Sequence, residues 1–381
     1  MRSRFPKLIN LYIQNIETFR FSGIEELEEI TQTLPDFPQS LPNLRSLTLY
    51  MREYVNRKSH SVDPFESLAP GLRRLNLTRV PLYPSFLRLR ALTELNLFGH
   101  QLDLPLDTLL DFLEENRSLE SATLDIGFTK PALRISRRRD AIVNQLLHLS
   151  ISAATAPTDA KALISKIALQ RGAHLEIVCS SYGRNPLKDF LSGIPTTHLL
   201  NLPSPTFMKY ESFNRSIQLF GPNGTFSCKG SPGYRHDLFL ELPLLPLTSI
   251  RELRLVHSQR RQSSVPFHSG FNPSFFPALE TFATSYDIWV SSTLSSLLSN
   301  PSYPVSLKTF AFLNCTLSGD FMEELKRFAS DRKNTTSARL RHVVIVDSQG
   351  NLPSVTSIEA LGEHVQIVDV RVGKELPTDL T

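Results

Sequence analysis

Hydrophobic residues recur along the chain in the spacing L-x-x-L-x-L, and a helical or loop segment follows each copy. The clearest copies begin at Leu72 and Leu92, where leucine occupies the first, fourth and sixth positions. The later positions of each copy alternate between apolar and polar residues, which predicts a short strand with one buried face. One copy is too small to bury its apolar face alone, so neighbouring copies must stack. Further copies begin at Leu8, Leu44, Leu119, Leu146, Ile250, Leu279, Leu307 and Leu340.

Helical spacing appears between several of these copies. Residues 105–116 place Leu106, Leu109, Leu110 and Leu113 on one face, and residues 321–331 repeat that arrangement. Thr356 and Glu359 have capping-box spacing ahead of another short helix. The alternation of strand and helix predicts an α/β fold, an irregular leucine-rich-repeat solenoid. We expect it to be curved, with parallel strands on the concave face and helices and loops on the convex face.

The same pattern predicts a single leucine-rich-repeat domain over residues 1–381. Residues 5–171 carry the clearer repeats, and residues 250–378 carry a C-terminal set. In residues 172–249 the spacing weakens, which we interpret as degenerate repeats, with a domain boundary as the alternative. The sequence Pro222-Asn223-Gly224 predicts a local β-hairpin within this stretch.

Composition excludes several classes of protein. The 381 residues are 20% charged with a formal net charge of only +4, so the charge balance demands no nucleic acid partner. The start of the chain lacks the apolar core of a secretory signal, and no apolar stretch is long enough to cross a membrane. Cys179, Cys228 and Cys315 are odd in number and far apart, which is typical of a reducing compartment. We therefore expect a cytoplasmic or nuclear protein.

No known catalytic signature occurs in the chain. Phosphate loops, dinucleotide fingerprints, zinc-protease helices, nucleophile elbows and paired cysteine ligands are all missing, so we expect no catalytic residues, no metal and no cofactor. The protein is not expected to be an enzyme. Basic runs at Arg134 with Arg137 to Arg139, and at Arg260 with Arg261, are either solvated loops or sites for nuclear import or an acidic partner.

Residues that alternate with the buried leucines should face solvent on the concave side. Their chemistry is mixed, as in protein interfaces, and the alternative is a polar face without a partner. Tyrosine and arginine are enriched at the energetic centres of interfaces, so Tyr50, Arg74, Phe98 and Arg254 are the candidate anchors. The full set of candidate partner-binding residues is Tyr50, Arg74, Asn76, Glu94, Asn96, Phe98, Asp125 and Arg254.

In repeats of this kind, Asn or Cys often closes the turn after the strand by bonding to the backbone. Only Cys315 fits that pattern in this chain, so we expect most turns to be closed by backbone or water. The residues at this position are Ile16, Arg52, Val80, His100, Gly127, Ser258 and Cys315.

The repeats L-P-N-L-R-S-L-T-L, L-R-R-L-N-L-T and L-T-E-L-N-L-F-G, with the stretch from Phe276 to Pro377, resemble fungal F-box leucine-rich-repeat proteins. The resemblance implies that the repeats capture a protein substrate for a ubiquitin ligase. In that family an N-terminal F-box binds a Skp-type adaptor and, through it, a cullin. We expect no F-box within this chain, so the adaptor and cullin are partners only if an F-box is encoded upstream.

Our functional hypothesis is therefore a monomeric protein-interaction module, similar to the substrate-recruiting domain of an F-box ubiquitin ligase receptor. The alternative is a free-standing leucine-rich-repeat scaffold or inhibitor with no ubiquitin-ligase role. In both cases a protein binds the concave face, and neither nucleic acid nor a membrane is a partner.

Overall fold

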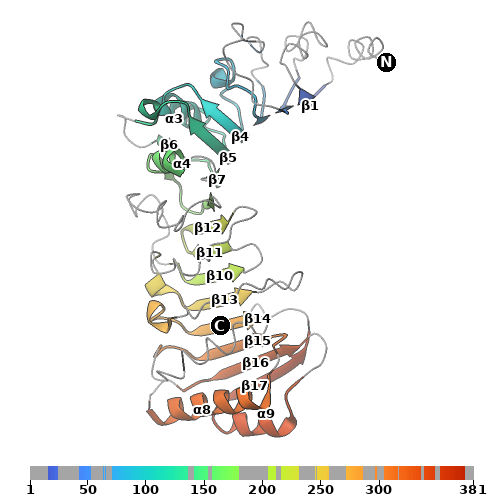
Figure 1. Cartoon of the computed structure of the whole chain (residues 1–381), viewed down its shortest axis with the longest axis vertical. Coiled ribbons are helices and arrows are strands. Elements are labelled where there is room, and N and C mark those ends of the chain that lie inside the picture. The colour runs from blue at the N-terminus through green and yellow to red at the C-terminus, as the bar shows by residue number, and fades with distance from the viewer. Residues whose placement is uncertain are drawn as a thin grey trace. The chain divides into compact units, whose positions relative to one another are not determined.

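The structure is a computed structural model with two compact units of α/β architecture (Figure 1). The first comprises residues 1–201 and 231–234, and the second residues 202–230 and 235–381. The structure describes residues 16–24, 43–52, 63, 65, 71–135, 141–152, 157–179, 205–211, 216–230, 245, 247–256, 272–285, 297, 304–315, 317–335, 339–347 and 352–373.

Seven strands of the first unit pair side by side, each parallel to the next. Five of them, β2 to β5 and β7, coincide with the copies predicted from Leu44, Leu72, Leu92, Leu119 and Leu146. β1 was not predicted, because the positions in register with Leu47 and Leu49 hold the half-buried Phe19 and Phe21 in place of leucines. The strands are β1 (Thr18–Ile24), β2 (Ser46–Met51), β3 (Arg74–Thr78), β4 (Glu94–Leu102), β5 (Ser121–Phe128), β7 (His148–Ser152) and β9 (His174–Cys179).

The repeat leucines form the core of this unit. Strand register aligns Leu47 with Leu75 and Leu95, and these three side chains have no exposed surface. Burial of each contributes roughly 1.5 to 3 kcal/mol to folding. Helix α3 (Leu106–Glu115) buries the predicted face with Leu109 and Leu113, which confirms that helix.

Smaller elements complete the first unit. Helix α4 (Pro157–Ile164) contacts β5 and β7. A two-stranded parallel sheet of β6 (Ala141–Val143) and β8 (Ile167–Leu169) lies against α3 through β6. Two 3-10 turns, η3 (Phe86–Arg88) and η4 (Pro131–Arg134), connect the repeats.

The second unit begins with an antiparallel meander and continues as parallel strands. The hairpin predicted at Pro222-Asn223-Gly224 is confirmed, since Gly221 pairs with Gly224 across the turn and Gly224 has a φ of +141°. The strands, in order of pairing, are β12 (Gly224–Gly230), β11 (Ser216–Gly221), β10 (Phe207–Glu211), β13 (Glu252–Val256), β14 (Thr281–Ser285), β15 (Thr309–Leu313), β16 (His342–Asp347) and β17 (Ile367–Val372).

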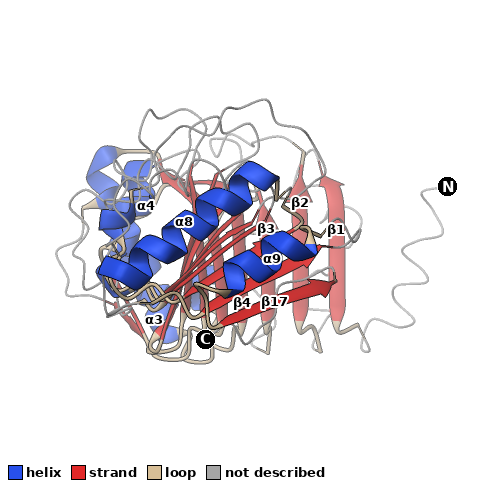
Figure 2. Ribbon diagram, turned by 90° about the horizontal axis from the view of Figure 1, so that it is seen from below, coloured by secondary structure: helices blue, strands red, loops and turns tan. Residues whose placement is uncertain are grey.

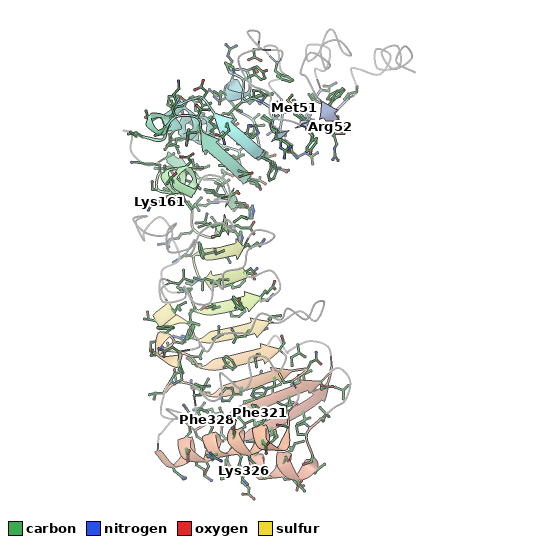
Figure 3. The ribbon with its side chains drawn as sticks, viewed as in Figure 1. Met51, Arg52, Lys161, Phe321, Lys326 and Phe328 are labelled. Atoms are coloured by element: carbon green, nitrogen blue, oxygen red, sulfur yellow. The ribbon has the colours of Figure 1, made fainter. Side chains whose placement is uncertain are left out.

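Helix α8 (Gly319–Thr335) packs on this sheet through phenylalanines. Ring centroids of Phe321 and Phe312 lie 5.4 Å apart, and those of Phe328 and Phe310 lie 5.6 Å apart. Figure 3 shows Phe321 and Phe328 on the side of α8 that faces the strands, with Lys326 on the opposite side. The helix predicted over residues 321–331 is therefore confirmed and is longer at both ends.

Helix α9 (Val355–Gly362) lies beside α8 (Figure 2). Its N-cap is Ser354, whose hydroxyl oxygen accepts a hydrogen bond from the Ser357 amide at 3.2 Å. The capping residue was predicted two positions too late, at Thr356, because hydroxyl residues at 354, 356 and 357 offer competing caps.

Several predicted features lie outside the described residues. They are the copy beginning at Leu8, the alternating stretches near residues 200 and 240, and the basic residues Arg137 to Arg139 and Arg260 to Arg261.

Candidate functional site

The first sheet has a polar face opposite its leucine core. Paired residues in a parallel ladder point to the same side, so the register arranges these polar side chains in rows, with about 4.8 Å between neighbouring strands. We call the part contributed by β1 to β4 the polar face. The middle row of the whole sheet contains Arg20, Thr48, Asn76, Asn96, Thr123, Ser150 and Glu176.

Two aromatic side chains stand on the polar face. Tyr50 on β2 is 41% exposed and Phe98 on β4 is 38% exposed. Both pair with Thr78 on the strand between them, so they lie about 10 Å apart. Two exposed aromatic rings at this distance can bracket one extended segment of another protein.

Arginines accompany these aromatic residues. Arg74 is exposed, pairs in register with Ser46 and Glu94, and its guanidinium makes no hydrogen bond or ion pair within the described part of the chain. Arg20 on β1 is equally exposed and equally unengaged there. Arg20 was not among the predicted residues, although its place between Phe19 and Phe21 is the alternation typical of a half-buried strand.

Amides and a carboxylate fill the space between the anchors. Asn96 donates through Nδ2 to Oε1 of Glu94 at 2.8 Å, and Asn76 pairs in register with Asn96. All three side chains are half-buried. This arrangement leaves donors and acceptors beside the aromatic rings, where a partner backbone can use them.

Asp125 has a structural role that the sequence did not predict. Its carboxylate accepts a hydrogen bond from the Gly99 amide at 3.2 Å. Gly99 has a φ of +65°, and the register of β4 against β5 shifts between Leu97 and His100. Asp125 therefore stabilises an irregular strand end, in addition to lying beside the polar face.

Arg254 is separated from the other seven candidates, because it lies on β13 in the second unit. Its guanidinium forms an ion pair with Glu252 and lies 5.3 Å from the centroid of the Phe207 ring. The Phe207 ring in turn stacks on Phe220 with 5.0 Å between centroids. Arg254 is thus already engaged within its own unit, and its role as a binding anchor stays a prediction.

The solvent-facing pattern also fails on β14 to β16. The positions that alternate with the core residues are Ala283, Ala311, Val344 and Val346, and all four are buried. They form a second apolar cluster on the opposite side of the sheet from Phe310 and Phe312. A polar binding surface is therefore absent at these four described positions.

Two turn positions are occupied by side chains that bond to the backbone. Cys315 approaches the carbonyl oxygens of Leu313 at 3.5 Å and Thr284 at 3.9 Å, as predicted. His100 is buried, and its Nε2 lies 3.1 Å from the carbonyl oxygen of Leu77, which makes this nitrogen the donor. The sequence pattern did not single out His100, whose imidazole serves the purpose of the usual amide.

Asn116 joins neighbouring repeats at the end of α3. Its Nδ2 donates to the carbonyls of Phe112 at 2.8 Å and Leu89 at 3.0 Å, and its Oδ1 accepts from the Leu92 amide at 3.1 Å. The residue is buried, and each polar atom of its amide group has a partner. The signal in the sequence was an asparagine directly after an amphipathic helix.

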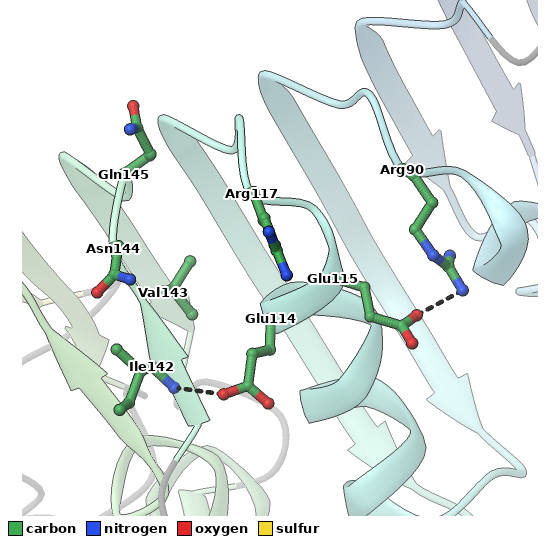
Figure 4. A pocket seen from close by; sticks show the side chains of 8 residues that line it. All are labelled: Arg90, Glu114, Glu115, Arg117, Ile142, Val143, Asn144 and Gln145. Atoms are coloured by element: carbon green, nitrogen blue, oxygen red, sulfur yellow. Dashed lines mark hydrogen bonds and ion pairs between the residues drawn. The ribbon is translucent and has the colours of Figure 1, made fainter.

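A pocket of about 700 Å³ lies beside the end of α3 (Figure 4). Glu115 forms an ion pair with Arg90, and Oε1 of Glu114 accepts from the Ile142 amide at 3.2 Å. Arg117 lines the same pocket and is exposed. The carboxylates and guanidinium groups that line this pocket are largely engaged with the chain itself. The pocket therefore holds no arrangement specific for a ligand.

The described residues carry no marks of a metal site or of a membrane span. No cluster of three or more histidine, cysteine or acidic side chains able to hold a metal occurs in the described part of the chain. Cys179, Cys228 and Cys315 are buried and form no disulfide. Among the helices that the structure describes, none combines the length and apolarity needed to span a membrane.

No protein-family model matches the chain, and no curated protein sequence matches it.

Proposed function

We propose that this protein is an interaction module of the leucine-rich-repeat class that binds another polypeptide on its polar face and catalyses no reaction itself. The repeat assignment is supported by agreement between the sequence pattern and burial. In the copy at β3, the residues at positions one, four and six are Leu72, Leu75 and Leu77, and none has exposed surface. The curved shape of the repeat array remains a prediction.

The observation that carries the proposal is the group formed by Tyr50, Phe98, Arg74 and Arg20. Exposed aromatic rings beside unengaged guanidinium groups combine apolar area with charge-assisted donors. Protein interfaces concentrate their binding energy in such residues. A small cofactor is usually bound in a mostly apolar site, whereas this surface is lined by arginine, amide and hydroxyl side chains beside the two aromatic rings.

The resemblance to fungal F-box leucine-rich-repeat proteins supports a more specific role. In this proposal the polar face holds a substrate, and a Skp-type adaptor and a cullin are partners only if an F-box is encoded upstream. Three buried cysteines that form no disulfide are in keeping with a reducing compartment, so we place the protein in the cytoplasm or nucleus.

Affinity purification of the full-length gene product tests the proposal. The variant Tyr50→Ala/Arg74→Ala/Phe98→Ala is compared with Ile142→Ala/Leu147→Ala/Val305→Ala, which removes three exposed apolar side chains away from the polar face. We expect the first variant to lose a substrate protein that the second retains, and both to retain adaptor and cullin. Equal recovery of every partner by the two variants would contradict the binding face. Absence of adaptor and cullin from both would remove the ubiquitin-ligase role and leave the interaction module.

A further inference from the structure

Strand β17 has one edge without a partner among the described residues. Its other edge pairs with β16, where the Ile367 amide donates to the Arg341 carbonyl at 2.9 Å. Because the amide direction alternates along a strand, the N–H and C=O groups of Val368, Val370 and Val372 point to the open edge. None of these valines makes a hydrogen bond elsewhere. The open edge of β17 therefore presents three donors and three acceptors.

The apolar ridge of the sheet is also left open at β17. Register aligns Phe310 with Val343 and Val368, so one row of core side chains runs to the last strand. Val343 is fully buried, Val368 is only half-buried, and Val372 at the end of the strand is 68% exposed. The apolar row is therefore less covered on β17 than on β16.

Exposed apolar side chains gather in this last repeat. Ten large hydrophobic side chains are exposed in the described residues, and four of them lie between residues 352 and 372. These four are Leu352 at 36%, Val355 at 69%, Ile367 at 57% and Val372 at 68% exposure. Ile367 and Val372 lie on β17 itself and, five positions apart, point to opposite faces of the strand, so each face carries an exposed apolar side chain at this edge.

Charge along β17 indicates which partner fits this edge. Asp369 and Arg371 point to one face of the strand, and Nε of Arg371 donates to Oδ2 of Asp369 at 2.7 Å. If a second copy of β17 runs antiparallel with Val370 opposite Val370, then Asp369 faces Arg371 of the second copy, and the reverse also holds. In the same register Val368 faces Val372 of the second copy. The strand is therefore complementary to itself in both charge and apolar surface.

We propose that two copies of this chain associate through the open edges of β17, in an antiparallel ladder with a two-fold axis at Val370. The outward amides of Val368, Val370 and Val372 are those that exchange hydrogen bonds in this register. Asp369 and Arg371 form the closer, non-hydrogen-bonded pairs, in which opposite charges stabilise the ladder. In this proposal the dimer replaces the monomer expected from the sequence. The edge is short, so the association should be weak and dependent on concentration.

Disulfide trapping tests the register. Val370→Cys places two thiols across the axis with about 5.5 Å between Cα atoms, which a disulfide can span. Val372→Cys is the matched control, because it is more exposed, yet its counterpart lies four residues away, at about 14 Å. The native cysteines are buried and do not compete. We expect oxidation of the full chain to trap dimer for Val370→Cys and at least tenfold less for Val372→Cys. Equal trapping of the two, or none, would overturn the proposal.

Charge reversal provides an independent test by sedimentation. Asp369→Arg and Arg371→Asp should each weaken self-association at least tenfold, since like charges then face each other. The double variant should restore it, and a mixture of the two single variants should form heterodimers. Circular dichroism checks that each variant is folded. Wild-type affinity in both single variants, failure of the double variant to recover, or a wild-type chain that is monomeric at all concentrations would overturn the proposal.

Discussion

The guanidinium group of Arg332 donates a hydrogen bond to the carbonyl oxygen of Leu307 at 3.0 Å and so joins helix α8 to the turn before β15. It also donates to the carbonyls of Pro304 and Val305, both at 3.1 Å, and lies 5.5 Å from the centroid of the Phe328 ring. Arg332 has no exposed surface, and burial lowers the pKa of its guanidinium. A buried cation that satisfies three carbonyls fixes the position of α8 on the sheet.

Removal of this cation should therefore be costly. Arg332→Ala leaves three inward carbonyls without donors and opens a cavity, so we expect the free energy of unfolding to fall by about 3 kcal/mol or more. Arg327→Ala on the exposed side of the same helix is the control and should change stability by less than about 0.5 kcal/mol. Urea denaturation of both variants measures the difference. Equal stability of the two would show that Arg332 does not hold α8.

Asn116 should contribute in the same way to the first unit. Asn116→Ala removes two donated hydrogen bonds and one accepted hydrogen bond at a buried site, and we expect a loss of about 2 to 3 kcal/mol. Arg117→Ala, at the neighbouring exposed position, should be close to neutral. Thermal unfolding of both variants checks this. A neutral Asn116→Ala would mean that the repeats around α3 are held by apolar packing alone.

His100 should tolerate an amide better than a methyl group. His100→Ala leaves the Leu77 carbonyl without its donor, which costs about 1 to 3 kcal/mol. His100→Asn keeps a donor at the turn and should recover part of this loss. Denaturant titration ranks the three proteins. If His100→Asn is less stable than His100→Ala, the hydrogen-bonding role is contradicted, and the volume of the imidazole ring matters more.

The pair formed by Asp369 and Arg371 should affect stability in acid. The hydrogen bond from Arg371 lowers the pKa of Asp369 below its ordinary value of about 3.9. A group with a lowered folded-state pKa stabilises the fold above its unfolded pKa, and this contribution disappears as the pH falls through the folded value. We expect wild type to be more stable than Asp369→Asn at pH 6 and the gap to close below pH 4. Unfolding of both proteins at several pH values measures the difference in their stability. A difference that does not change with pH would show that the pair formed by Asp369 and Arg371 is not its cause.

The strands that could be predicted from the sequence are those in which spacing and burial coincide. In β3 and β4 the leucines at 75, 77, 95 and 97 are both the periodic residues and the core, so a local pattern sufficed. β1 was not predicted because its inward-facing residues are the half-buried Phe19 and Phe21, without a preceding leucine. β10 was not predicted because its buried residues, Met208 and Tyr210, lie in a stretch of sequence without the repeat spacing.

The candidate site was predictable where exposure follows from strand alternation alone. Tyr50, Arg74 and Phe98 lie on the polar face for this reason. Arg254 follows the same alternation, but Phe207 comes beside it only when β10 pairs with β13, which no local pattern reveals. The burial of Ala283 and Ala311 likewise could not be predicted from a local pattern, because it depends on tertiary contacts.

Site-specific photocrosslinking tests the central claim most directly. A photoreactive phenylalanine analogue replaces Tyr50, Phe98 or, as an exposed control away from the polar face, Leu147. After irradiation of cells that express the full-length protein, we predict that positions 50 and 98 capture the same polypeptide and that position 147 does not. A polypeptide captured at position 147 but at neither position 50 nor position 98 would contradict the assignment of the polar face as the binding surface.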